Sequence, residues 1–169
     1  MIISCWNIRG LNSPNKQSEV TKFIHANHVD IMGIVETKIK DTNIASVQNR
    51  LIPSWEFLNN SCNRIWVTWN PNSVKVSLLK ESKQLIHVLV EDLYLNKVFE
   101  LSFVYGLHTS QERKDLWKSL SSINSATLGN PWIVLGDFNE VLALSEIFGG
   151  NQLQVQGMAD FNDIMNACC

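Results

Sequence analysis

The sequence has few charged residues and no excess of either sign. Charged residues make up 18% of the 169 positions, below the roughly 25% that is usual for soluble domains. The 14 basic and 16 acidic residues give a formal net charge of −2. The chain therefore lacks the overall basic charge of a typical nucleic-acid-binding domain. Binding to nucleic acid would require a local basic patch, or a metal ion that offsets the repulsion from phosphate.

Proline and glycine are also scarce. With 4 prolines and 8 glycines, the chain is neither collagen-like nor dominated by linkers. Hydrophobic residues reach 45%, which is enough for a core and excludes a disordered tail. The length is that of one domain, so we expect a single domain over residues 1–169.

Long apolar runs and metal-binding cysteine pairs are missing. No stretch approaches the about 20 apolar residues of a membrane span, so we expect no membrane partner. Residues 1–5 lack the basic region and the long apolar region of a signal peptide. The cysteines Cys5, Cys62, Cys168 and Cys169 form no C-x-x-C pair, which argues against zinc and fits reduced thiols. We expect an intracellular protein, nuclear or cytoplasmic, that is not secreted.

The first third of the chain alternates between strand and helix patterns. Residues 2–8 form a short apolar, β-branched run, and residues 30–35 form another. Between them, Ser13-Pro14 predicts the start of a helix over residues 14–27. This β-α-β order favours parallel pairing of the two strands with a right-handed crossover. A weaker helix pattern follows over residues 41–51.

The middle of the chain has the pattern of a β meander. Several of its apolar runs alternate with polar residues, as half-buried antiparallel strands do. The expected strands are 55–57, 64–69, 74–79, 84–90 and 97–105.

The last third returns to helices around one buried strand. Thr109 and Glu112 have the spacing of a capping box before a helix, on which we expect Arg113 and Lys114 to lie on an exposed face. A strand follows at 132–135, and then a final amphipathic helix. The whole order predicts an α/β fold, a sandwich of two mixed β-sheets flanked by helices.

Polar residues follow three of the expected strands. Asn7 ends the first strand, Glu36 follows the second, and Asp137 with Asn139 follows the late one after Gly136. Ligands bind beyond the carboxyl ends of strands in α/β sheets, and carboxylate oxygens suit Mg²⁺. Each position alone also fits an ordinary role, such as a solvated strand end or an Asx-turn.

In combination, four ordered motifs resemble the endonuclease/exonuclease/phosphatase superfamily. The match is most similar to the apurinic-like endonuclease domain of plant LINE-type (non-LTR) retrotransposons, and it spans residues 2–167. Further residues typical of that branch are Arg64–Val67 and Trp69–Pro71. The four motifs are Ser4–Asn12, Ile34–Lys38, Val104–Gly106 and Gly136–Glu140.

The resemblance implies a site for Mg²⁺-dependent hydrolysis of DNA phosphodiesters, with Mn²⁺ as a substitute ion. Glu36 would be the main metal ligand, assisted by Asn7. Asp137 would orient or deprotonate the attacking water, and Asn139 would hold the scissile phosphate. Tyr105 would hydrogen-bond that phosphate or stabilise the charged transition state.

Two further residues are expected to contact substrate. Arg9 follows the first strand end and is placed to meet a flanking phosphate, although a solvated rim fits it equally well. His108, three residues after Tyr105, matches a position where relatives often have a phosphate-contacting polar residue.

The sequence departs from the superfamily pattern in one respect. Complete members carry a C-terminal Ser-Asp-His motif, whereas here all four histidines, His25, His28, His87 and His108, precede Asp137. This implies a domain without its C-terminal strands and with an incomplete second sheet. We then expect impaired activity, an exposed sheet edge beside residues 132–135 that permits self-association, and unburied apolar residues on the last helix.

Three alternatives remain open on the sequence alone. The chain is a catalytically inactive remnant with residual metal or nucleic-acid binding, a superfamily enzyme for a phosphoinositide or lipid headgroup, or an unrelated α/β domain whose strands end in ordinary polar residues.

Overall fold

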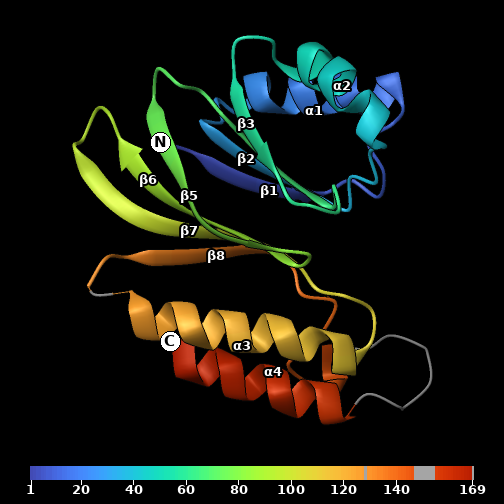
Figure 1. Cartoon of the computed structure of the whole chain (residues 1–169), viewed down its shortest axis with the longest axis vertical. Helices are drawn as coiled ribbons and strands as arrows, with labels where there is room; N and C mark the ends of the chain where they lie inside the picture. The colour runs from blue at the N-terminus through green and yellow to red at the C-terminus, as the bar shows by residue number, and fades with distance from the viewer. Residues whose placement is uncertain (128, 147–154, 169) are drawn as a thin grey trace. The chain divides into compact units, whose positions relative to one another are not determined.

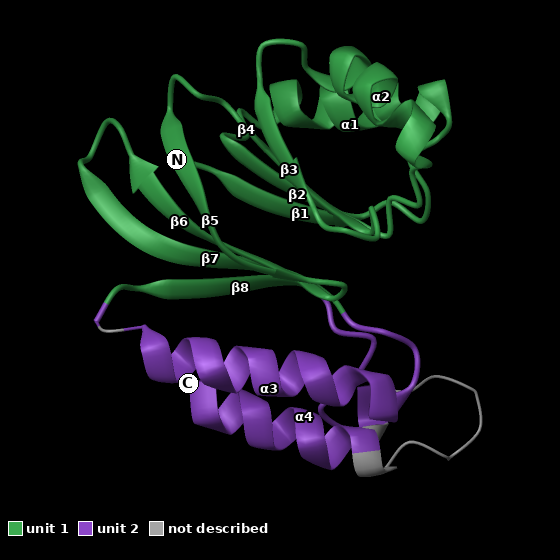
Figure 2. Cartoon of the chain, viewed as in Figure 1, with its two compact units in different colours: residues 1–105, 130–136 green, residues 106–129, 137–169 purple. Residues whose placement is uncertain are grey.

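The computed structural model describes residues 1–127, 129–146 and 155–168 (Figure 1). The chain divides into two compact units, coloured green and purple in Figure 2. Unit 1 comprises residues 1–105 and 130–136, and unit 2 comprises residues 106–129 and 137–169. Cys169 lies outside the described residues.

The first sheet of unit 1 has the strand order β1-β2-β4-β3. Strands β1 and β2 are parallel, and their register runs from Ile3 opposite Ile31 to Asn7 opposite Val35. Strand β4 is antiparallel to β2. The parallel pair confirms the expected β-α-β unit. The strands are β1 (Ile3–Asn7), β2 (Ile31–Val35), β3 (Glu56–Asn59) and β4 (Ile65–Trp69).

Helices α1 (Pro14–Ala26) and α2 (Ile44–Leu51) cover one face of this sheet (Figure 1). Their apolar faces are buried together with the facing side chains of β2 and β4, including Ile34 and Trp66. The helix expected at 41–51 begins instead with a 3₁₀ turn, η1 (Asp41–Asn43), and only then becomes α-helical. These helices close the outer face of the sheet.

The second sheet of unit 1 has the order β5-β6-β7-β8. Of the five strands expected in one meander, β5 to β7 form an antiparallel meander here, whereas β3 and β4 belong to the first sheet. Within the described residues, no strand follows β8 in this order, and Ile133 on β8 is 40% exposed. The strands are β5 (Val74–Ser82), β6 (Leu85–Asp92), β7 (Lys97–Tyr105) and β8 (Trp132–Asp137).

The main core of unit 1 lies between the two sheets. It joins side chains of β2 and β4, such as Val35 and Val67, with side chains of β6 and β7, such as Val88 and Phe103. At Gly33 in β2 the approach is so close that any Cβ would overlap the ring of Phe103. The expected α/β architecture of two β-sheets with flanking helices is confirmed, and each sheet has four strands.

Unit 2 contains helices α3 (Ser110–Ala126) and α4 (Val155–Cys168), which lie side by side (Figure 1). The expected capping box at the start of α3 is present, with Thr109 and Glu112 hydrogen-bonded reciprocally. The rings of Trp117 and Phe161 stack with centroids 5.3 Å apart. Phe161 is 6% exposed and Ile164 is 7% exposed, so the expectation of unburied apolar residues on the last helix is wrong at these positions.

Among the described residues, no helix is both long enough and apolar enough to cross a membrane.

Candidate active site

The loops after β1 and β2 place Asn7 and Glu36 beside each other in unit 1. Asn7 pairs with Val35 at the end of the parallel ladder, and Glu36 is the next residue of the chain. Backbone hydrogen bonds continue the pairing past both strands, so the two loops run together. The amide of Ile8 donates to the Val35 carbonyl at 3.1 Å, the amide of Gly10 to the Glu36 carbonyl at 2.8 Å, and the amide of Leu11 to the Thr37 carbonyl at 2.7 Å.

Three residues of these loops have left-handed backbone conformations. The φ angles are 58° at Glu36, 52° at Lys38 and 49° at Arg9. Such a conformation costs a non-glycine residue about 1–3 kcal/mol and persists only where the surroundings hold it. Thr37 supplies that anchor: its side chain is fully buried and its hydroxyl donates to the Asn63 carbonyl. The strained backbone therefore lies where the sequence predicts the metal ligand.

The carboxylate of Glu36 lies in a positive environment. Lys38 Nζ is 2.5 Å from Glu36 Oε1. The hydrogen bond from Lys38 holds the pKa of Glu36 below its ordinary value; burial opposes this, and the Asn7 side chain and the charges of Lys38 and Arg9 reinforce it. Glu36 is thus ionised over the neutral range and ready to face a cation.

Tyr105 and Arg9 complete the predicted residues of unit 1. Tyr105 is the last residue of β7, is 2% exposed, and donates its amide to Gln84 at 3.0 Å. The side chain of Arg9 is exposed next to the loop that carries Glu36, and its carbonyl accepts a hydrogen bond from Lys16 Nζ at 3.0 Å. Unit 1 therefore brings Asn7, Arg9 and Glu36 into one cluster.

Asp137 and Asn139 form a tight turn in unit 2. The amide of Asn139 donates to Asp137 Oδ1 at 2.9 Å. This is an Asx-turn, the ordinary structural role that the sequence left open as the alternative to a functional site. Asn139 has φ 49°, and its side-chain Nδ2 donates to the Gly106 carbonyl at 2.6 Å. The Gly106 amide donates in turn to the Asp137 carbonyl at 2.8 Å. The predicted pair is thus tied to the loop that follows β7.

His108 lies in that same loop and is exposed. Its carbonyl accepts a hydrogen bond from Arg113 Nη1 at 2.8 Å, so its backbone is fixed while its side chain is open to solvent.

Arg113 is the residue that sequence reasoning placed wrongly. It was expected on an exposed helix face, but its side chain is completely buried and forms an ion pair with Glu140. The pattern that reveals this is its spacing: Leu116, Trp117 and Leu120 follow it at three, four and seven residues, which puts all four on one face of α3. An arginine on the apolar face of a helix needs a buried partner.

The donor set at Glu36 fits a hard divalent ion bound mainly through water. No group of three or more histidine, cysteine or acidic side chains capable of holding a metal exists within the described ranges. Mg²⁺ does not need one, because it is commonly held by one or two carboxylates and keeps several waters. Glu36 and the amide oxygen of Asn7 meet that requirement.

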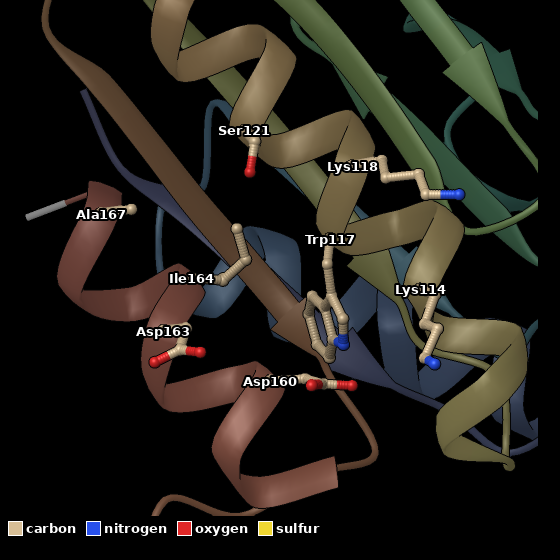
Figure 3. A pocket seen from close by; sticks show the side chains of 8 residues that line it. All are labelled: Lys114, Trp117, Lys118, Ser121, Asp160, Asp163, Ile164 and Ala167. Carbon is tan, nitrogen blue, oxygen red and sulfur yellow. The ribbon is translucent and has the colours of Figure 1, made fainter. Parts of the chain in front are cut away.

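A surface groove in unit 2 contains none of the predicted site residues. It lies between α3 and α4, has a volume of about 620 Å³, and presents two lysines from α3 opposite two aspartates from α4 (Figure 3). The residues that line it are Lys114, Trp117, Lys118, Ser121, Asp160, Asp163, Ile164 and Ala167. Its balanced charge gives no site for a phosphate backbone.

Residues 5–157 match the model of the endonuclease/exonuclease/phosphatase family, and the chain belongs to that family. This match includes all of the predicted site residues. No curated protein sequence is similar enough to match the chain. The family's description names endonucleases, exonucleases and phosphatases, so hydrolysis of phosphate esters is the class of chemistry that the family performs.

Solved structures of low sequence identity share the fold. The endonuclease domain of TRAS1, a telomere-specific non-LTR retrotransposon, is 10% identical with a TM-score of 0.70, covering 95% of this chain and 70% of that one. An AP endonuclease from Archaeoglobus fulgidus is 14% identical with a TM-score of 0.68, covering 98% and 70%. The human Nocturnin catalytic domain is 18% identical with a TM-score of 0.55, covering 80% and 63%. The chain thus spans between three fifths and three quarters of the length of these structures.

Proposed function

We propose that this chain is a DNA endonuclease domain of the retrotransposon type, which hydrolyses phosphodiesters with Mg²⁺ inside the cell. The observation that carries the proposal is Glu36, an ionised carboxylate held in a left-handed backbone next to Asn7. Strained, charged positions at strand ends are where protein sites concentrate. The family match supports the chemistry, and the similarity to an AP endonuclease and to a retrotransposon endonuclease domain supports the substrate.

Each residue has a defined role in this proposal. Glu36 and Asn7 hold the metal ion, which neutralises charge on the phosphate when bound. Asp137 orients or deprotonates the attacking water. Asn139 donates one side-chain hydrogen to Gly106, and its second hydrogen is directed to a phosphate oxygen. Tyr105 stabilises the same phosphate in the transition state.

Arg9 and His108 act outside the chemical step. Both side chains are exposed, and we propose that they contact phosphates that flank the scissile bond. Such contacts position the nucleic acid and make binding dependent on salt. A lipid headgroup offers no such row of phosphates, and soluble inositol phosphates serve as the competing substrate in the test.

The second candidate is a catalytically inactive remnant that retains metal or nucleic-acid binding. It is favoured by the formal net charge of −2, because the chain has no overall basic charge to attract nucleic acid. We also propose that residues 1–169 act as one domain, because the family match runs through residues of both units. A single cooperative unfolding transition is the expected behaviour.

The deciding experiment is nicking of supercoiled plasmid by the 169-residue chain. We expect slow nicking with Mg²⁺ or Mn²⁺, none with EDTA, and none in Glu36→Gln, which keeps the shape of the side chain but removes its charge. Circular dichroism confirms that both proteins are folded. Absence of nicking by the folded wild type, with Mg²⁺ binding retained, would establish the remnant instead. Faster release of phosphate from inositol phosphates than cleavage of DNA would overturn the substrate.

A further inference from the structure

Arg113 is a fully buried cation whose hydrogen bonds all go to loop residues. Nη1 donates to the carbonyls of Leu107 and His108, both at 2.8 Å. Nη2 pairs with Glu140 Oε2, and neither side chain of this ion pair has any exposed surface. A buried ion pair is weak evidence for stabilisation, because the cost of removing both charges from water offsets their attraction.

The ion pair connects the two loops that carry the predicted phosphate-binding residues. Glu140 directly follows Asn139, and Leu107 directly follows Gly106. Asn139 Nδ2 donates to the Gly106 carbonyl at 2.6 Å. These contacts form a closed ring. The loop after β7 is bonded to Asn139, Glu140 follows Asn139 and pairs with Arg113, and Arg113 donates back to the loop after β7.

The first turn of α4 encloses this ring. Any Cβ at Gly157 would overlap Glu140 Oε2 and would lie 3.2 Å from Arg113 Nη2. A side chain at this position would require the Glu140 carboxylate to move. The enclosure keeps water from the ion pair, and hydrogen bonds in such surroundings are stronger and hold their geometry more firmly.

We propose that Arg113 is a positioning residue, which through Glu140 and the Leu107–His108 carbonyls fixes the direction of the Asn139 side chain. This inference deepens the proposed function and rests on it, since Asn139 is the residue assigned to the phosphate. Lysine cannot replace arginine here, because one ammonium group lacks the planar fork that reaches two carbonyls and a carboxylate together. The alternative is that Arg113 only fastens α3 to the rest of unit 2.

The test compares Arg113→Lys with Arg50→Lys, a matched exchange at an exposed position of α2. The first readout is the side-chain NH₂ of Asn139 by nuclear magnetic resonance on the full chain, assigned through Asn139→Asp. In Arg113→Lys we expect a changed chemical shift and hydrogen exchange about tenfold faster, as expected when a hydrogen bond worth about 1.4 kcal/mol is lost. Arg50→Lys should match the wild type.

The second readout is the kinetics of plasmid nicking with Mg²⁺ well below the melting temperature. We expect kcat to fall by up to about 100-fold, the effect of ångström-scale misplacement of a catalytic group, with KM within about twofold of the wild type. A residue that only fastens the helix would lower the melting temperature and leave kcat per folded molecule unchanged. Glu140→Gln, which keeps the shape and removes the charge, tests the same ring if Arg113→Lys does not fold.

The two proposals fail in different ways. If the Asn139 resonance and its exchange are unchanged in a folded Arg113→Lys or Glu140→Gln protein, the positioning role is overturned, whatever the activity. If the wild type does not nick DNA but the Asn139 resonance shifts as expected, the positioning role stands and the proposed endonuclease activity fails.

Discussion

Lys38 Nζ lies 2.5 Å from Glu36 Oε1, so the carboxylate assigned to the metal already has a counter-ion two residues away. Lys38 is itself in a left-handed conformation and its side chain is half exposed. An arriving divalent cation must displace this ammonium group or share the carboxylate with it.

We therefore expect Lys38→Met to bind Mg²⁺ more tightly than the wild type. Removing the lysine also removes the main influence that lowers the pKa of Glu36, which then moves back toward its ordinary value. The carboxylate stays ionised at neutral pH, so the lost competition dominates and affinity rises several-fold. Titration calorimetry with Mg²⁺ at pH 7.5 measures this, and Lys40→Met at an exposed position is the control. Unchanged or weaker affinity in Lys38→Met would show that Glu36 is not the ligand.

His87 predicts how the stability of unit 1 depends on pH. Its Nε2 is 3.1 Å from Glu100 Oε2, and its Nδ1 is 2.9 Å from the Ser102 hydroxyl. The Ser102 oxygen accepts a hydrogen bond from Trp132 Nε1 at 2.9 Å. Burial lowers the pKa of His87 below its ordinary value of 6.5, although the Glu100 carboxylate acts in the opposite direction. Between pH 6.5 and the lower pKa of the folded state, the unfolded chain binds more protons at His87 than the folded chain does. Stability therefore falls as the pH falls through this window, by at most about 1.4 kcal/mol per pH unit.

Urea unfolding between pH 5 and pH 7 measures this slope. In His87→Gln we expect lower stability throughout, because Glu100 and Ser102 lose a partner, and a flatter dependence on pH. His25→Gln, at an exposed position, should keep the slope of the wild type. Stability that rises as the pH falls from 7 to 5 would mean that the Glu100 charge outweighs burial.

Gly33→Ala tests the closest approach of the two sheets in unit 1. The new Cβ overlaps the ring of Phe103, and overpacking of this kind costs about 1–3 kcal/mol. In a protein that already carries Phe103→Leu, Gly33→Ala should cost less stability than it does in the wild type, since the smaller side chain leaves space for the methyl group. Free energies of unfolding in urea for the four proteins complete the cycle, and strictly additive effects would contradict the contact.

We expect the chain to self-associate through β8, the outer strand of the second sheet in the described part of unit 1. Ile133 is 40% exposed on this strand, and unprotected edges pair readily with other chains. Ile133→Lys should lower the weight-average mass seen in sedimentation at high concentration. Tyr94→Lys, which removes a 75% exposed aromatic side chain from the turn between β6 and β7, is the control. An equal effect of both variants would indicate general hydrophobic association.

Local patterns were sufficient for most of the fold. Strand β7 was predicted with its exact residues, and the β-α-β unit and the capping box followed from residues close together in the chain. Strand β5 continues to Ser82, three residues beyond its expected end, because its pairing with β6 continues that far. A register shift between Leu78 and Lys80 also explains why two adjacent leucines interrupt the alternation. The end of a strand and its register depend on pairing with the neighbouring strand, and the periodicity of the strand's own residues does not predict them.

The candidate site was predictable in its residues but not in its geometry. The sequence indicates that Asn7 and Glu36 lie at the ends of neighbouring parallel strands, and the structure confirms that they do. The left-handed backbone of Glu36 depends on Thr37 and its bond to Asn63, a contact across 26 positions that no local pattern encodes. The burial of Arg113 was missed for a related reason, since its partner Glu140 is 27 positions away.

Thr37 points inward and is fully buried, whereas Glu36 and Lys38 on either side of it pair with each other. The Lys38 ammonium group thus compensates the charge of the Glu36 carboxylate without any ion. The charge of Glu36 is compensated while the protein folds, so folding at this position does not require a metal ion. Under the proposed function, a Mg²⁺ ion would then be needed for the chemical step and not for the shape of this loop.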